Sequence, residues 1–130
     1  MTVWVADDNV AAGLLFRLYA MTEREDFREA GARTLVAFGP RLRTAPHATP
    51  RMICAAMNAT GAPSQIVFAG ERSSAPFQAL TRAAHTRFLP NYVLLHGKET
   101  VNGQPAAYVC RNFTCQLPVT TVDALNDLLK

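Results

Sequence analysis

Two of the three cysteines, Cys110 and Cys115, are separated by four residues near the end of an apolar run. Such a pair can form a disulfide switch, supply half of a metal site or hold one reactive thiol. Structural zinc needs four ligands, usually from cysteine pairs with two to four intervening residues. Only Cys54 and three histidines remain to complete such a site. The spacing therefore makes a redox pair the better functional candidate than a metal site.

The simplest interpretation of Cys110 and Cys115 is nevertheless structural. Cysteine is among the most buried residue types, and Cys110 ends the strand-like residues 108–110. A reactive thiol needs access and a nearby cation or helix N-terminus. Arg111 follows Cys110 directly, but neighbouring side chains of a strand point to opposite faces. We therefore expect both thiols to be reduced and largely unreactive, although a tight turn would permit a disulfide between them.

The segment 70–74, Gly-Glu-Arg-Ser-Ser, is a second candidate site because a strand is predicted to pass into a helix there. Backbone N–H groups and the helix dipole at such a point can hold an anion. Gly70, Ser73 and Ser74 are the candidate ligands. Glu71 opposes an anion, and the segment matches no phosphate-binding glycine motif. An ordinary turn with a serine cap is the simpler interpretation.

The other polar residues predict no catalytic, cofactor-binding or metal site. His47, His85 and His96 lack the spacing of metal ligands on one helix. Asp7 and Asp8 stand at a predicted helix start, where acids ordinarily act as caps, and no acid is identifiable as their glycosidase partner. The Gly-x-Ser-x-Gly elbow of a serine hydrolase does not occur. We therefore expect no cofactor.

The first half of the chain is predicted to be helical. The two adjacent aspartates can cap a first helix, and acids within residues 23–26 suit the start of a second. Thr49 and Pro50 predict the start of a third helix, which runs to about residue 59. Apolar residues recur at helical spacing in the first two: Val10, Leu14, Leu15 and Leu18, then Phe27, Ala30, Leu35, Phe38 and Leu42. A short link between them predicts an αα-hairpin.

The second half changes to strands that alternate with helices. Residues 65–69 and 92–95 are apolar runs typical of buried strands, and a helix that begins at Ser73 or Ser74 lies between them. This order predicts a parallel β-α-β crossover. Residues 106–110 predict a third strand, and Thr120 or Thr121 is expected to cap a last helix. The inner faces of the two helices are predicted to be Phe77, Leu80, Ala84 and Phe88, then Leu125, Leu128 and Leu129.

The predicted fold class is α/β. An N-terminal helical hairpin and a third helix pack on a small three-stranded mixed sheet that contains the β-α-β crossover, with the fourth and last helices on its faces. We expect one domain over residues 1–130, with a helical part at 1–61 and an α/β part at 62–130. A chain of this length can bury a core of its own.

Four segments carry a family resemblance: residues 8–12, 65–70, 88–91 and 107–118. With them the chain resembles the C-terminal end of the thioredoxin-domain proteins related to spermatogenesis-associated protein 20 and bacterial YyaL. In that family a thioredoxin-like domain comes first. A toroid of paired helices follows, similar to six-hairpin glycosidases and sugar epimerases. The resemblance implies that the first two helices here look like the last hairpin of the toroid and that the β-α-β part looks like its C-terminal cap.

Composition narrows the expected partners. The net charge is +3 and the arginines are scattered, whereas a nucleic-acid footprint needs clustering. No apolar run approaches the roughly 18 residues of a membrane span, and the basic start of a signal peptide is missing, so we expect a cytoplasmic location. Charged residues make up only 18%, which favours a homo-oligomer or covalently linked upstream domains. The expected contact surface comprises Leu14, Leu15 and Leu18 beside Val3, Trp4 and Val5.

These observations favour a non-catalytic structural or interaction domain. The chain lacks the Cys-x-x-Cys of a thioredoxin site and has too few helices for a sugar-binding toroid. Two alternatives stay open. One is a thiol-redox accessory domain that uses Cys110 and Cys115, and the other is a sugar-binding or epimerase-like fragment completed by missing helices. Enzyme activity is not expected from the 130-residue chain alone.

Overall fold

The computed structural model describes residues 8–130, and side chains from residue 10 onward. The chain divides into two compact units, Met1–Pro63 and Ser64–Lys130. This division lies two residues from the predicted change between a helical and an α/β part, whereas the single domain stays a prediction. The proposed cap at Asp7 and the apolar residues Val3, Trp4 and Val5 lie outside the described residues.

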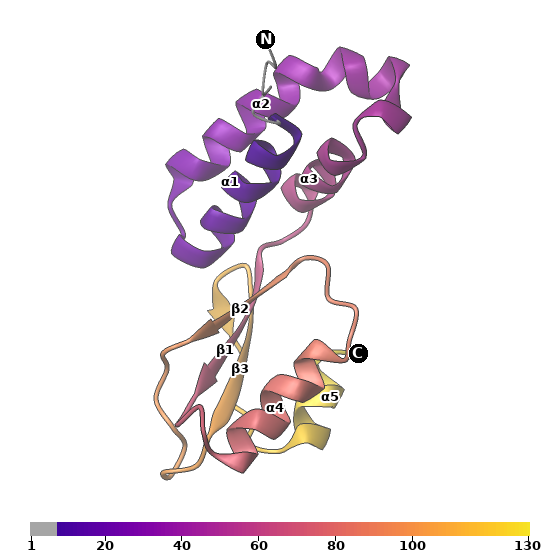
Figure 1. Cartoon of the computed structure of the whole chain (residues 1–130). Helices are drawn as coiled ribbons and strands as arrows, with labels where there is room; N and C mark the ends of the chain where they lie inside the picture. Colours follow the sequence, from indigo (N-terminus) through magenta and orange to yellow (C-terminus); the bar gives the residue numbers. More distant parts are fainter. Residues whose placement is uncertain (1–7) are drawn as a thin grey trace. The chain divides into compact units, whose positions relative to one another are not determined.

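The first unit contains the three predicted helices (Figure 1). They are α1 (Asp8–Thr22), α2 (Glu25–Thr44) and α3 (Pro50–Thr60), with a short 3-10 helix, η1 (Pro46–Ala48), before α3. Pro50 begins α3 as expected, because its missing N–H costs nothing in the first helical turn. The predicted cap by Thr49 is wrong in detail: its side chain is buried and makes no capping hydrogen bond.

A small core joins α1 to α3. Its buried members are Ala12, Phe16, Met52 and Ala55, and Leu35, Phe38 and Leu42 of α2 pack against them. Three of the five residues in the apolar stripe that predicted α2 therefore lie against this core, where they are partly buried. The predicted αα-hairpin of α1 and α2 is also confirmed, with Glu23 at φ 60° in the two-residue link.

The second unit is a mixed sheet with two helices. Its elements are β1 (Ser64–Ala69), α4 (Ala75–His85), β2 (Tyr92–His96), β3 (Ala106–Arg111), β4 (Thr114–Cys115) and α5 (Val122–Leu128). The strand order is β2-β1-β3-β4, with β1 and β2 parallel and the other two pairs antiparallel. The α/β class and the β-α-β unit are confirmed. The sheet has four strands and not the predicted three. Strand β4 was not predicted because its two residues are too few to show a periodic pattern.

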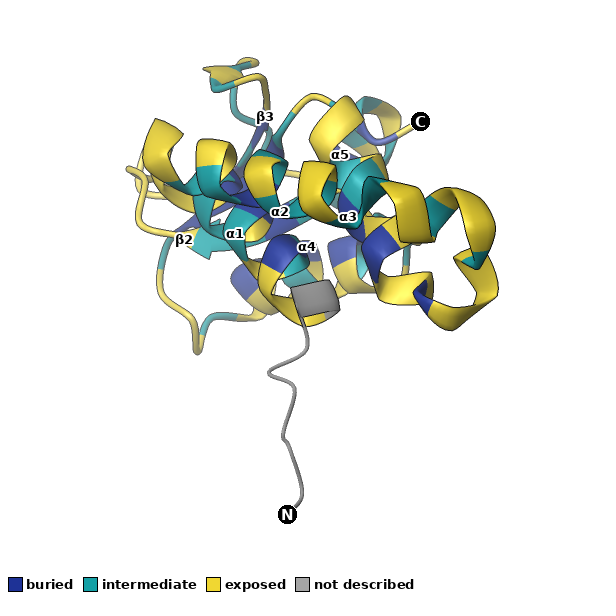
Figure 2. Ribbon diagram, turned by 90° about the horizontal axis from the view of Figure 1, so that it is seen from above, coloured by how far each residue is buried: buried dark blue, intermediate teal, exposed yellow. Residues whose placement is uncertain are grey.

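Helices α4 and α5 share one face of the sheet. Ile66 and Phe68 of β1 and Val109 of β3 form one cluster with Leu80 of α4 and Leu125 of α5. Figure 2 shows buried residues in the strands and exposed residues along the outer faces of the helices. The sequence predicted α4 and α5 on the faces of the sheet. They lie on the same face, because alternate residues of β1 and β3 point to that face and contact both helices.

Phe88 does not belong to the inner face of α4. The helix ends at His85, and the Phe88 side chain is 91% exposed. The spacing of Phe88 continues the helical pattern of α4 beyond His85. The helix has already ended there, so Phe88 does not reach the inner face that the pattern predicted for it. The other predicted core positions of α4, namely Phe77, Leu80 and Ala84, are buried.

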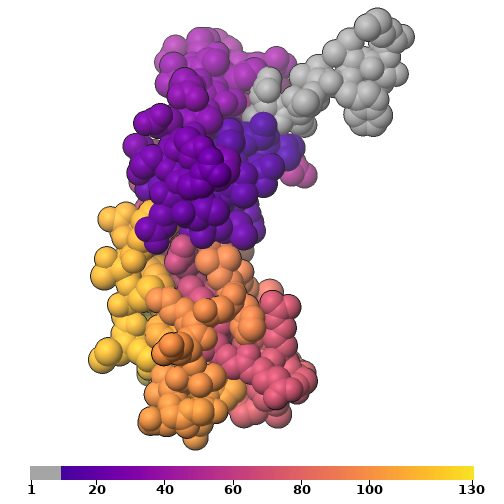
Figure 3. Space-filling view, turned by 90° about the vertical axis from the view of Figure 1, so that its left-hand side faces the viewer, coloured from indigo at the N-terminus to yellow at the C-terminus, as the bar shows by residue number. Residues whose placement is uncertain are grey.

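The segment between β2 and β3, residues 97–105, lies at the surface of this unit (Figure 3). Two backbone hydrogen bonds between Val101 and Gln104 close a turn within it. The Tyr108 hydroxyl of β3 donates to the Glu99 carbonyl oxygen at 2.8 Å. This contact ties the segment to the strand that carries Cys110.

Candidate functional site

The β3–β4 hairpin holds the two cysteines opposite each other. Its strand pairs are Arg111 with Thr114 and Cys110 with Cys115. Asn112 and Phe113 form the turn with φ of 50° and 62°, the left-handed values of a type I′ turn. Asn adopts this region readily, whereas a bulky aromatic residue there carries backbone strain.

Cys110 and Cys115 form a disulfide. Their sulfur atoms are 2.07 Å apart and their Cα atoms 3.8 Å apart. The prediction of reduced thiols is therefore wrong. Four intervening residues separate the cysteines in the sequence, but a two-residue turn makes them direct partners across the hairpin. The candidate redox pair is thus brought together by a strand that the sequence pattern did not reveal.

The two sulfurs differ in their surroundings. Cys110 is completely buried, whereas Cys115 is half-buried on the edge strand β4. The Lys98 ammonium donates to the Cys115 sulfur at 3.4 Å and lies 5.0 Å from the centre of the Tyr108 ring. Tyr108 in turn holds the neighbouring Glu99 carbonyl. Lys98 therefore has a defined position beside the more accessible sulfur.

The sequence correctly excluded Arg111 as a cation that activates Cys110, but it gave no indication that Lys98 lies beside Cys115. Arg111 donates from Nε to the Tyr92 hydroxyl at 3.3 Å, on the sheet face that α4 and α5 cover. It is thus directed away from Cys110, as strand alternation predicted. Lys98 lies in a loop 12 residues before Cys110, and no local spacing links the two positions. Only the folding of residues 97–105 over β3 brings this charge to the disulfide.

The predicted anion segment is a hydrogen-bonded turn. The Ser73 hydroxyl donates to the Glu71 carboxylate at 2.6 Å, and the Ser74 hydroxyl donates to the Glu71 carbonyl at 2.8 Å. Ser74 precedes α4 but does not cap it with its side chain. Gly70 has φ of 119° and its carbonyl oxygen is 2.9 Å from His96 Nε2. Anion binding by Gly70, Ser73 and Ser74 stays a prediction.

The histidines do not converge. His96 packs the edge of its ring on Phe77, with ring centres 5.4 Å apart, while His47 follows α2 and His85 ends α4. Within the described residues, no group of three His, Cys, Asp or Glu side chains is arranged to hold a metal ion. The helices that the structure describes also include none long and apolar enough to cross a membrane.

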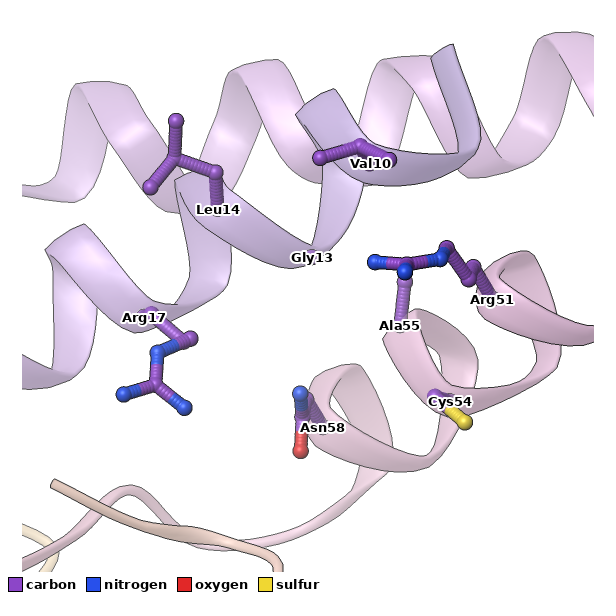
Figure 4. A pocket seen from close by; sticks show the side chains of 8 residues that line it. All are labelled: Val10, Gly13, Leu14, Arg17, Arg51, Cys54, Ala55 and Asn58. Carbon is purple, nitrogen blue, oxygen red and sulfur yellow. The ribbon is translucent and has the colours of Figure 1, made fainter. Parts of the chain in front are cut away.

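A second surface feature, the α1–α3 groove, lies within the helical unit (Figure 4). Its volume is about 470 Å³. Each helix contributes four residues at positions i, i+3, i+4 and i+7, which is the spacing of one helix face. The lining residues are Val10, Gly13, Leu14 and Arg17 of α1 and Arg51, Cys54, Ala55 and Asn58 of α3.

The α1–α3 groove combines an apolar floor with two cations. Leu14 is 54% exposed and Val10 is 43% exposed, so this stripe is only partly covered. Figure 4 shows Arg51 near the Val10 end of the groove and Arg17 near Asn58 at the other end. None of the described lining residues is acidic. The free thiol of Cys54 is exposed at the same surface.

The sequence anticipated part of this surface. Leu14, Leu15 and Leu18 were predicted to form an apolar stripe that the helical hairpin alone does not cover. Leu14 lines the groove, whereas Leu15 and Leu18 are half-buried. The contribution of α3 was missed, although the same i, i+3, i+4, i+7 spacing from Arg51 to Asn58 is visible in the sequence once its partner helix is known.

Comparison with known proteins places the chain in a lineage. It is 30% identical to human spermatogenesis-associated protein 20 over 139 aligned residues, which cover 94% of this chain and 18% of that protein. It is 27% identical to an uncharacterized protein of Caenorhabditis elegans over 92% of this chain and 18% of the relative. The chain thus spans about a fifth of the length of the curated relatives it matches.

Two further comparisons gave no match. No family model matches the chain, and no solved structure matches it. The similarity covers nearly the whole chain and a small share of each longer relative, so this chain corresponds to one part of such proteins. By this homology, the chain belongs to the family of spermatogenesis-associated protein 20.

Proposed function

We propose that this chain is a non-catalytic interaction domain whose helical unit binds an acidic amphipathic helix of a partner polypeptide in the α1–α3 groove. The observation that carries the proposal is the pair of matching helix stripes, one from α1 and one from α3. Two adjacent helices with such stripes offer a third helix a place to pack, as in helix-in-groove recognition.

The floor of the groove suits close packing. Gly13 has no atom within 4 Å of the position that a Cβ would take, and Ala55, which also lines the groove, is fully buried. Small residues at these positions leave room for large apolar side chains of the partner. Leu14 and Val10 supply the exposed apolar area that such side chains would cover.

The charges select the partner. Arg17 and Arg51 form no ion pair with a described side chain, so their charges are available to a ligand. They stand toward opposite ends of a face that spans seven residues, which is about 10 Å along a helix. A helix with two acidic residues about two turns apart, and leucines between them, matches both ends. A second copy of this surface would bring arginine against arginine.

The test uses a synthetic amphipathic peptide with two glutamates two turns apart and a leucine face between them. A control peptide carries lysines in place of the glutamates. We expect the acidic peptide to bind the full chain in fluorescence anisotropy, to bind less tightly at high salt, and to lose affinity for the Arg17→Glu, Arg51→Glu variant. The matched variant Arg43→Glu, Arg82→Glu changes two exposed arginines elsewhere and should bind the peptide normally.

Two results would contradict the proposal. One is equal binding of the acidic and lysine peptides, because the arginines would then not select the ligand. The other is a homodimer in light scattering that Leu14→Glu converts to monomer, because the occupant would then be a second copy. Three further proposals do not depend on this binding test. They are a thioredoxin-like and glycosidase-like architecture of the longer relatives, sugar binding by this chain, and a cytoplasmic location.

A further inference from the structure

We infer that Cys110 and Cys115 are a redox-active pair that exchanges with external thiols and disulfides, with Cys115 as the sulfur that meets the external reactant and Lys98 as its activating cation. This activity lies in the α/β unit and is independent of helix binding by the α1–α3 groove. Three observations carry it: the unequal exposure of the sulfurs, the position of Lys98 and the construction of the hairpin.

The difference in exposure determines which of the two sulfurs reacts with an external thiol. Cys110 is 0% exposed, whereas Cys115 is half-buried on the edge strand β4. An external thiol can therefore reach the Cys115 sulfur and not that of Cys110. Attack on a disulfide sulfur proceeds through a mixed disulfide, so the mixed disulfide should form on Cys115 while Cys110 is the leaving group.

Lys98 gives Cys115 the character of a nucleophile when the pair is reduced. The ammonium lies 3.4 Å from the Cys115 sulfur, and a cation at this separation favours the thiolate over the thiol. Lys98 takes part in none of the ion pairs between described side chains, so its charge is not neutralised by a described carboxylate. The Tyr108 ring and the hydrogen bond to the Glu99 carbonyl hold the segment in place.

The hairpin can yield when the bond opens. Strand β4 has two residues, and only two pairs join it to β3. One more hydrogen bond, from the Gln116 N–H to the Val109 carbonyl at 2.9 Å, follows it. The turn also holds Phe113 at φ 62°, a conformation that surrounding structure must impose on a bulky residue. Without the disulfide, we expect residues 112–116 to open more often.

The exchange balances with an external thiol–disulfide couple as the co-reactant. In the oxidising direction, the Cys115 thiolate attacks an external disulfide, forms a mixed disulfide and releases one external thiolate. The Cys110 thiol then loses its proton to solvent, attacks the Cys115 sulfur and releases the second external thiolate. Two electrons pass from the cysteine pair to the external disulfide, and the two released thiolates take up protons. The reverse sequence reduces the pair.

The experiment uses the full chain equilibrated with reduced and oxidised glutathione at different ratios. Trypsin cleaves after Arg111, which separates Cys110, in residues 99–111, from Cys115, in residues 112–130. Differential alkylation and mass spectrometry then measure each cysteine alone, and Cys54 serves as an exposed reference in the same sample. We expect Cys110 and Cys115 to convert together while the protein stays folded by circular dichroism.

Single variants assign the roles. In Cys110→Ser, glutathione should add readily to Cys115, whereas in Cys115→Ser it should add to Cys110 far more slowly. Lys98→Met keeps an unbranched chain but removes the charge, and should slow Cys115 alkylation at neutral pH about fivefold after reduction. Lys130→Met is the matched control, because Lys130 is the other lysine of the chain and pairs with Asp127. It should leave the rate unchanged.

The assignment fails under three outcomes. If the disulfide is reduced only when the chain unfolds, the bond is structural. If Cys110 reacts faster than Cys115 in the folded single variants, the order of the sulfurs is wrong. If Lys98→Met and Lys130→Met react with glutathione and alkylating agent at the same rate as the wild type, Lys98 has no activating role. Circular dichroism and the Cys54 reference distinguish each of these results from a misfolded variant.

Discussion

Gly31 of α2 lies directly against the ring of Phe16 of α1. A Cβ atom at Gly31 would be 3.0 Å from two of the ring carbons, and Phe16 is itself buried in the core of the helical unit. The absence of a side chain at Gly31 therefore allows the two helices of the hairpin to approach closely.

Gly31→Ala should destabilise the helical unit. Overpacking a core costs about 1–3 kcal/mol, and the better helix propensity of alanine returns at most about 1 kcal/mol. We expect a net loss of about 1 kcal/mol in urea unfolding followed by circular dichroism. Gly13→Ala is the matched control, since a Cβ there meets no atom within 4 Å, and it should be neutral or stabilising. Equal effects at both positions would show that the Phe16 contact is unimportant.

Gly70→Ala should be more damaging. Gly70 has φ of 119°, and its Cβ would come within 2.9 Å of the Pro105 Cβ, so strain and clash add. We expect a loss of about 2–3 kcal/mol in unfolding free energy. Gly97→Ala separates the two causes, because φ there is 145° but no atom lies within 4 Å. A similar loss in both variants would leave the Pro105 contact without a role.

Removal of the disulfide should weaken the α/β unit. The bond closes a short loop, with a sequence separation of five, for which loop entropy predicts about 2 kcal/mol. The double variant Cys110→Ala, Cys115→Ala should lose this amount in denaturant unfolding, and hydrogen exchange of residues 112–116 should rise. Cys54→Ala changes an exposed free cysteine and should stay within about 0.5 kcal/mol of the wild type.

Phe113→Gly should stabilise the hairpin. Glycine adopts φ 62° without strain, whereas phenylalanine does not. The expected gain is about 1 kcal/mol, read from the thermal unfolding of the α/β unit. Asn112→Gly provides the comparison, because asparagine already tolerates the φ of 50° found there, so its gain should be smaller. A loss of stability in Phe113→Gly would mean that contacts of its ring outweigh the backbone strain.

Asp26 should titrate below its ordinary range. Hydrogen bonds from the Arg24 side chain, at 2.6 Å and 3.1 Å, lower the pKa of this carboxyl group. Because its pKa is lower in the folded state, the interaction stabilises the fold above the unfolded pKa and is lost as the pH falls through the folded value. An NMR titration of the carboxyl carbon measures this pKa. Arg24→Gln should raise this pKa. Arg33→Gln should not, because it removes an exposed arginine of α2 that pairs with Glu29 and not with Asp26.

Local pattern alone determined much of the architecture. The apolar runs at 65–69 and 92–95, with a helix between them, correctly predicted the parallel β1–β2 pair. The start of α3 at Pro50 was also visible in the sequence. Of the two candidate caps for α5, Thr120 and Thr121, it is the Thr121 hydroxyl that accepts from the Ala124 N–H. Each of these features depends on residues within a few positions of one another, so periodicity and capping preferences suffice to reveal it.

Tertiary structure decided what these elements bring together. A two-residue turn aligns Cys110 with Cys115, and a loop places Lys98 beside them. Helix α4 ends at His85, which leaves Phe88 exposed to solvent. The α1–α3 groove forms because the two helices pack side by side and each presents one face of lining residues. The physical reason is the same in each case: the contact joins segments whose spacing in the sequence carries no period, so only the path of the folded backbone determines which side chains meet.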